Sequence, residues 1–206
     1  MIETHRINDC EVLFDPIKHE YTVDGVTVVS VSKIVDALLP KNYKRIDPEI
    51  LRIAAEKGTE LHDMIERYET TGEKTKHVEM QSYLAVKAQH QFEVIENEKI
   101  VLIYDHGQVV AAGRFDMIVK SPFIRGFGIV DVKRMAHLDD NRLKLQLNLY
   151  KLGYEQTYKK KTHYLKCIHI RKRHHHYHDI PIDIAYAKTM LKTYLKHHPQ
   201  PYVVEY

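Results

Sequence analysis

The sequence predicts one α/β domain in which helices flank a mixed β-sheet. Its 206 residues are 44% hydrophobic and 29% charged, as in an ordinary globular domain. β-branched segments bounded by turn residues alternate with segments of helical period, and no repeat or low-complexity linker divides the chain. We expect an N-terminal hairpin and helix over residues 1–45, a central core over 46–160, and a C-terminal hairpin and helix over 161–206.

The N-terminal part is expected to form two short strands and a helix. The segment from Glu11 to Val29 surrounds Asp24-Gly25, a strong signal for a tight turn. Ser32 is a suitable N-cap for a helix that ends at Pro40. The apolar residues of that helix are Ile34, Val35, Leu38 and Leu39.

A longer helix follows, with Asp47 as N-cap and Pro48 in its first turn. Its apolar residues recur at helical spacing: Ile50, Leu51, Ile53, Ala54, Leu61, Met64 and Ile65. Gly58 interrupts the pattern at a cost of about 1 kcal/mol relative to alanine, and such a glycine invites close backbone approach. His62 and Glu66 follow at intervals of one turn on the same face.

Two strands of a hairpin are expected after a second helix. Polar residues 72–77 predict a loop, and a helix is expected from about Val78 to Glu96. The strand Ile100–Tyr104 then turns at residues 105–107 into a strand that ends with Asp116. Turn residues at Ser121-Pro122 and an apolar run that begins at Gly128 predict that a further strand pairs with it.

Charged residues stand on this further strand beside the expected core. Asp131 and Lys133 are two residues apart, so their side chains point to one face while Val132 packs on the other. Ionised groups beside a core are costly without a partner such as a metal ion. The pattern therefore marks a candidate site.

The next helix is predicted over Arg142–Thr157, after a polar loop over residues 135–141. Two apolar sets compete for its buried side: Leu143, Leu147, Tyr150 and Tyr154, or Leu145, Leu149 and Leu152. Gln146 and Tyr150 are one turn apart and share a face. Taken alone, Tyr150 suits the core and Gln146 the surface.

The C-terminal part predicts a strand over His163–Ile170, a basic hairpin tip over Arg171–His178, and a helix over Ile184–Lys196. The tip holds four histidines, for which zinc binding, contact with a DNA backbone and an exposed turn without function all remain open. The tyrosine and methionine stripe of the helix (Tyr186, Met190, Tyr194) fits a core better than a base-stacking surface. A tail over Pro199–Pro201 follows.

Four motifs follow one another along the chain: Gly58-Thr59-Glu60-Leu61-His62, Gly113-Arg114-Phe115-Asp116, Asp131-Val132-Lys133, and Gln146 with Tyr150. Together they resemble the PD-(D/E)xK nuclease superfamily, and within it the RecB-like, phage-type exonuclease branch. The segment from Phe14 to Tyr21 also resembles the N-terminal hairpin of phage-borne members. The resemblance implies a restriction-endonuclease-like core and a metal-dependent deoxyribonuclease. Lys57 departs from the pattern, because many relatives have arginine there.

The resemblance also implies roles for individual residues. His62, Asp116, Asp131 and the main-chain carbonyl of Val132 would bind one or two Mg²⁺ or Mn²⁺ ions. Glu98 is a further candidate ligand, with Glu93 and Glu96 as competitors, and Glu66 is either a partner of His62 or a surface charge. Asp116, Asp131, Lys133, Gln146 and Tyr150 would form the catalytic set.

Charge is distributed unevenly along the chain. Residues 134–206 contain 14 Lys and Arg against 6 Asp and Glu, a net of +8; the remaining residues have 31−14 = 17 against 28−6 = 22, a net of −5. Basic side chains near a metal site suit a polyanion such as DNA. The candidate DNA contacts are Arg142, Lys144, Lys172 and Arg173.

Several function classes are disfavoured. Only Cys10 and Cys167 are present, so neither a disulfide framework nor an iron–sulfur cluster is expected. The sequence has no apolar run long enough for a membrane span, no signal peptide and no phosphate-binding loop, so we expect a cytoplasmic protein that is no ATP-driven motor.

The leading hypothesis is an exonuclease that hydrolyses phosphodiester bonds from DNA ends in phage or mobile-element recombination, repair or replication. Its expected substrate is DNA that has free ends or is single-stranded. A recombination or replication protein is a conceivable partner. A structure-specific or restriction-type endonuclease is the alternative within the same class. An inactive DNA-binding or interaction module on the same fold is the alternative from another class. Polarity, DNA against RNA preference and oligomeric state stay open.

Overall fold

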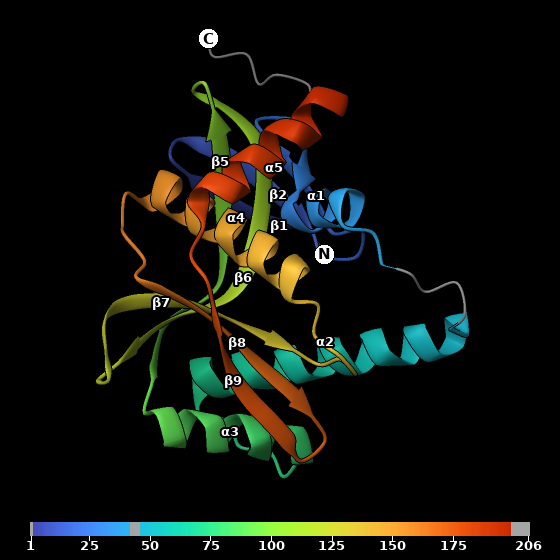
Figure 1. Ribbon diagram of the computed structural model, residues 1–206, viewed down its shortest axis with the longest axis vertical. Helices are drawn as coiled ribbons and strands as arrows, with labels where there is room; N and C mark the ends of the chain where they lie inside the picture. Colours follow the sequence, from blue (N-terminus) through green and yellow to red (C-terminus); the bar gives the residue numbers. More distant parts are fainter. Residues whose placement is uncertain (1, 42–45, 199–206) are drawn as a thin grey trace.

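The computed structural model describes residues 2–41 and 46–198 (Figure 1). Within these ranges the chain forms five helices and nine strands. The helices are α1 (Val31–Leu38), α2 (Pro48–Thr71), α3 (Val78–His90), α4 (Asp140–Tyr158) and α5 (Ile184–His197). The strands are β1 (Glu3–Ile7), β2 (Cys10–Asp15), β3 (Glu20–Val23), β4 (Val26–Ser30), β5 (Glu93–Asp105), β6 (Gln108–Ser121), β7 (Ile124–Lys133), β8 (Tyr164–Arg171) and β9 (His174–Ile180).

The strands form a mixed, mostly antiparallel sheet, which confirms the predicted α/β class. Its order is β1-β2-β3-β4-β6-β7-β8-β9, with β5 paired to β6 as a branch. The pairs β4–β6 and β7–β8 are parallel, and every other pair is antiparallel. The predicted hairpin of β6 and β7 is present, so the strands that carry Asp116 and Asp131 are neighbours.

Helices cover both faces of the central strands. Helices α1, α4 and α5 pack on one face around Phe115, Leu147 and Cys167. Helices α2 and α3 pack on the other around Met117, Val130 and Val132. The N-terminal strands β1–β4 enclose a third core with parts of β5 and β6, so the sheet bends over that end. Figure 1 shows α4 and α5 on one side of the central strands, with α2 and α3 together at the opposite end of the molecule.

The N-terminal prediction of two strands is wrong in number, because β1 and β2 form an additional hairpin. Its turn uses Asn8 and Asp9 at positive φ (49° and 66°), a conformation that Asn and Asp tolerate. The predicted turn at Asp24-Gly25 does join β3 to β4. The cap of α1 is Ser30, not Ser32, because Ser30 Oγ accepts a hydrogen bond from Lys33 N–H at 3.2 Å.

The second helix of the core is shorter than predicted, and the strands around it are longer. Helix α3 ends at His90, where Gln91 adopts a left-handed conformation, so Glu93 and Glu96 lie in β5 rather than in a helix. Strand β5 pairs with β6 as far as Lys120, which places Asp116 within β6 and not at its end. Long-range pairing thus overrides the local helical pattern.

Helix α4 buries both competing apolar sets, because α1, α5 and the sheet enclose it from several sides. The predicted start of α2 is confirmed, with the Asp47 side chain accepting from Glu49 N–H at 2.8 Å. The C-terminal hairpin differs from the prediction, because residues 174–178 belong to β9 itself and the turn is formed around Lys172 and Arg173. The tail over Pro199–Pro201 lies outside the described residues. None of the five described helices has the length and apolar character needed to cross a bilayer.

Candidate metal centre

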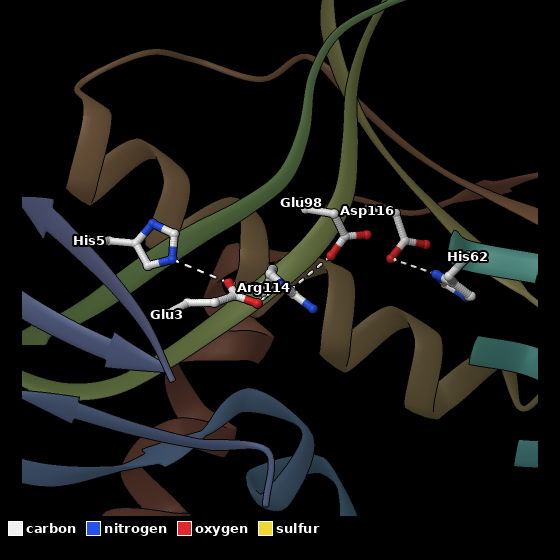
Figure 2. Close-up of polar contacts among 6 residues, drawn as sticks. All are labelled: Glu3, His5, His62, Glu98, Arg114 and Asp116. Atoms are coloured by element: carbon white, nitrogen blue, oxygen red, sulfur yellow. Dashed lines mark hydrogen bonds and ion pairs between the residues drawn. The ribbon is translucent and has the colours of Figure 1, made fainter. Parts of the chain in front are cut away.

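Three side chains from three elements meet beneath helix α2: His62 of α2, Glu98 of β5 and Asp116 of β6. One ligand atom from each lies within 4.8 Å of the others, and Figure 2 shows Asp116 between the other two. Glu98 reaches this place because β5 pairs Lys99 with Phe115, which sets Glu98 beside Asp116. Glu98 also has a positive φ of 45°, which turns the strand locally.

Asp116 is the centre of the group. Its Oδ1 lies 3.3 Å from His62 Nδ1, and its Oδ2 accepts a hydrogen bond from the Val132 N–H at 2.5 Å. Burial raises the pKa of the Asp116 carboxyl, but His62, Lys133 and the Val132 N–H together hold it below its usual value. Asp116 is therefore a carboxylate in the folded protein.

The charge of Asp116 favours the protonated cation of His62 and the neutral form of Glu98. Burial lowers the pKa of His62, but the charge and hydrogen bond of Asp116 outweigh it and raise the pKa to about 9. Burial and repulsion from Asp116 raise the pKa of Glu98 to about 7. Crowded carboxylates of this kind share protons or bind a cation.

Asp131 and Lys133 lie beside this group on β7. Lys133 Nζ is 2.5 Å from Asp131 Oδ2, and Asp131 is buried. Burial raises the pKa of Asp131 to about 6, since the repulsion by Asp116 adds to it and Lys133 offsets only part. Burial alone would lower the pKa of Lys133, but the charges of Asp131 and Asp116 raise it above its usual value. Lys133 is therefore a cation at neutral pH.

Gln146 and Tyr150 share the face of α4 that borders the site. Gln146 Nε2 donates to Tyr150 Oη at 3.1 Å, and burial raises the pKa of Tyr150 to about 12. The ring of Tyr150 also explains Gly113 of β6, because a Cβ there would lie 2.8 Å from Tyr150 Cε1. The glycine of the second motif thus makes room for the tyrosine of the fourth.

An arginine that sequence reasoning left without a role connects the N-terminal strands to the group. Arg114 Nε lies 2.8 Å from Glu98 Oε2, and its Nη1 lies 3.3 Å from Glu3 Oε2 on β1 (Figure 2). The guanidinium also stacks on Phe14, 4.5 Å from the ring centre. The position of Arg114 within the second motif could have suggested a role at the site. Nothing in the sequence indicated its contact with β1.

The structure separates the three competing glutamates. Glu98 belongs to the group, whereas Glu96 contacts Lys99 at 2.7 Å and accepts a hydrogen bond from Tyr154. Glu93 is exposed at the start of β5. Glu66 lines the same cleft as His62.

A cleft of about 810 Å³ contains the site. All six side chains implied by the motifs line it: His62, Asp116, Asp131, Lys133, Gln146 and Tyr150. Gly58 and Thr59 contribute from α2, and the N-terminal strands and their turns contribute His5 and His19. A second cavity of about 590 Å³ shares Ser32, Lys133 and Gln146 with the cleft and is lined further by the loop after β7.

The four candidate DNA contacts lie in two places, on α4 and in the turn between β8 and β9. Arg142 is buried and hydrogen-bonds to the Leu39 carbonyl and to Asp36, so it fastens α1 to α4 at the wall of the second cavity. Lys144 pairs with Asp183 at 2.7 Å. Lys172 and Arg173 form the exposed turn of the β8–β9 hairpin, and neither they nor Lys144 line the two cavities.

The histidines of β9 alternate as expected for a strand. The rings of His176 and His178 are 5.6 Å apart, and the His169 ring of β8 lies 6.1 Å from that of His178. Their ligand atoms do not converge: in residues 2–41 and 46–198 only His62, Glu98 and Asp116 form a group of three potential metal ligands. The hairpin therefore offers no zinc site among these residues.

Comparisons with known proteins assign no family to the chain. No family model matches, and no curated protein matches. Among solved structures, the chain is similar to one titled "Crystal structure of SSO0001", at 17% sequence identity and a TM-score of 0.44, with 84% of this chain and 77% of that chain covered.

Proposed function

We propose that the protein is a metal-dependent DNA nuclease with a restriction-endonuclease-like core, of the RecB-like branch, that removes nucleotides from DNA ends. One observation carries this proposal. Four motifs that are scattered over residues 58–150 send their characteristic side chains into one cleft. Convergence of this kind is what a shared reaction requires, whereas a fold alone does not require it.

The donor atoms suit a hard divalent cation. Two carboxylates and one imidazole within 4.8 Å are appropriate ligands for Mg²⁺ or Mn²⁺, and the histidine favours Mn²⁺ slightly. His62, Glu98 and Asp116 would hold the first ion, with Asp131 and the Val132 carbonyl available to the same ion or to a second. Such an ion supplies an activated water and charge neutralisation at the phosphate.

Lys133 acts as a cation rather than as a base, because its neighbouring carboxylates keep it protonated. Its Nζ would orient the attacking water and stabilise negative charge on the phosphate oxygens as the new P–O bond forms and the old one breaks. Gln146 holds the neutral Tyr150 hydroxyl beside it, so this pair positions the lysine or a backbone phosphate.

The experiment is digestion of end-labelled linear and covalently closed circular DNA, single- and double-stranded, with Mg²⁺, Mn²⁺ or EDTA. The variants are Asp131→Ala and Lys133→Met. Lys87→Met is a matched control, because Lys87 also lies 2.5 Å from a carboxylate and has a similar side-chain exposure (24% against 20%), but it pairs with Glu69 outside the cleft. An RNA strand of the same sequence is included.

We expect metal-dependent loss of linear DNA only, abolished in both site variants and retained in Lys87→Met. Cutting of closed circles would indicate an endonuclease rather than an exonuclease. Binding of DNA without cleavage under any condition would favour the inactive module. If the wild-type chain neither binds nor cleaves any nucleic acid, the proposal is refuted.

A further inference from the structure

The cleft has an unusual wall at Gly58. Gly58 lies inside α2, one turn before His62, and lines the cleft that contains the proposed metal centre. A Cβ built at Gly58 meets no heavy atom within 4 Å among the described residues. The chain therefore has room for a side chain there, yet it has none.

A second helical glycine shows the contrast. A Cβ at Gly153 of α4 would lie 3.0 Å from Val101 Cγ2 and 3.1 Å from Ile103 Cγ1, so that helix needs glycine in order to pack on β5. Packing explains Gly153 but not Gly58. Glycine inside a helix is unfavourable because it fixes a flexible backbone without side-chain contacts in return. Gly58 thus has a cost that no contact within the described chain offsets.

A ligand in the cleft would supply the missing reason. Glycine is used where another molecule must approach a backbone closely. The cleft volume of about 810 Å³ lies within the range of about 300–1,000 Å³ typical of organic ligand sites, and far exceeds what one ion needs. His5 and His19 of the N-terminal segment also line it, so its walls extend beyond the ligand group.

We infer that a nucleotide of the substrate strand, adjacent to the phosphodiester at the metal centre, packs against α2 at Gly58. This subsite rests on the proposed nuclease function and adds a specificity-determining residue to it. Gly58 leaves space for the nucleotide, and any side chain there would occupy that space. The neighbouring Thr59 is exposed at the edge of the cleft, where its hydroxyl donates to the Ala55 carbonyl at 3.3 Å and can still accept a hydrogen bond from the same nucleotide.

The test uses Gly58→Ala and Gly58→Leu in the full chain. Ala55→Leu is the matched control, because Ala55 is exposed on α2 and outside the cleft. Three quantities are measured for each protein: the melting temperature, the dissociation constant of a fluorescent single-stranded oligonucleotide in EDTA, and KM and kcat on linear DNA with Mn²⁺. Gly153→Ala is a second control, because replacing this closely packed glycine should lower the melting temperature.

We expect stability and binding to change in opposite directions. Gly58→Ala should raise the melting temperature by about 2–4 °C. Gly58→Ala should also raise KM and the dissociation constant several-fold, and Gly58→Leu should raise both at least about tenfold. These factors correspond to losing nucleotide contacts equivalent to about 1–2 buried methylene groups or more. Ala55→Leu should bind and cleave as the wild type does.

Other outcomes overturn the inference. If Gly58→Leu binds and cleaves DNA like the wild type, nothing packs against Gly58 and only the subsite falls. If Gly58→Ala lowers the melting temperature, the helix itself needs the glycine. If the wild-type chain neither binds nor cleaves nucleic acid, the nuclease proposal fails and the subsite fails with it.

Discussion

Helix α2 borders two groups of largely buried carboxylates that differ in how their charge is balanced. Beside α3, each carboxylate has its own cation: Glu69 lies 2.5 Å from Lys87, and Glu79 lies 2.7 Å from Arg134. In the cleft, Glu98, Asp116 and Asp131 also have partners in Arg114, His62 and Lys133, but these carboxylates lie close to one another. Burial and mutual repulsion raise the pKa of Glu98 and of Asp131. The first arrangement stabilises the fold, while the second brings carboxylates together at a cost in repulsion that a bound cation would reduce.

The comparison separates structural from functional charges. A pair beside α3 can be broken only at the expense of stability, because the remaining charge stays buried without a partner. Glu98 or Asp131 can be neutralised with little loss of stability, because its removal also relieves repulsion. The charge of Asp116 is different, because its neighbours stabilise it in the folded protein. The predictions below test this separation.

The largest effect is expected from Asp116→Asn. This change removes the charge at the centre of the ligand group, and we expect cleavage to fall by about 10³-fold or more. The melting temperature should fall as well, because His62, Lys133 and the Val132 N–H stabilise the charged form of Asp116. The increase of melting temperature on adding Mn²⁺ should disappear as well, which is measured without any reaction. An unchanged response to Mn²⁺ would place the metal elsewhere.

Lys87→Met should lower stability without lowering cleavage. The change leaves Glu69 with Tyr83 Oη at 2.7 Å but without its cation. We expect a loss of about 3 kcal/mol in the free energy of unfolding, measured in urea. Cleavage per folded molecule should remain that of the wild type. A loss of cleavage without a loss of stability would contradict the division between the two groups.

Arg114→Gln tests whether a charge in the cleft positions a ligand. Arg114 lies against one oxygen of Glu98 and so leaves the other for a metal ion. Partners of metal ligands typically contribute about 10–100-fold to metal affinity, so we expect Mn²⁺ to bind about tenfold more weakly by calorimetry. Arg114→Lys should restore part of the affinity. Arg67→Gln, at an exposed pair with Glu73, is the control.

Local patterns were sufficient to predict much of the fold. The N-cap at Asp47, the turn at Asp24-Gly25 and the hairpin of β6 and β7 depend on neighbouring residues, and the sequence predicts all three. The predicted end of α3 was wrong, because Glu93 and Val94 pair with β6, a segment distant in the sequence. Propensity within one segment contains no information about such a partner.

The same limit applies to the candidate site. Spacing alone predicts that Asp131 and Lys133 share a face, and that Gln146 and Tyr150 do. It could not separate Glu98 from Glu96, because the irregular backbone at Glu98 decides which of the two reaches Asp116. Spacing also could not place Arg142. Its charge suggested a phosphate contact, but the side chain is buried against α1.

The smallest predicted effect concerns the pH dependence of stability at Glu79. Burial raises the pKa of Glu79, but Arg134 and the Lys172 N–H outweigh it and hold the pKa below its ordinary value of 4.5. Between these two values the unfolded chain binds more protons than the folded one, so this contribution to stability is complete above about pH 4.5 and is lost as the pH falls further. We expect Glu79→Gln to cost about 1 kcal/mol at pH 7 and less at pH 3. Urea unfolding across this range measures it, with exposed Glu73→Gln as the control. A cost that stays constant with pH would mean that hydrogen bonds, rather than the charge of Glu79, hold α3 to Arg134 and to the turn at Lys172.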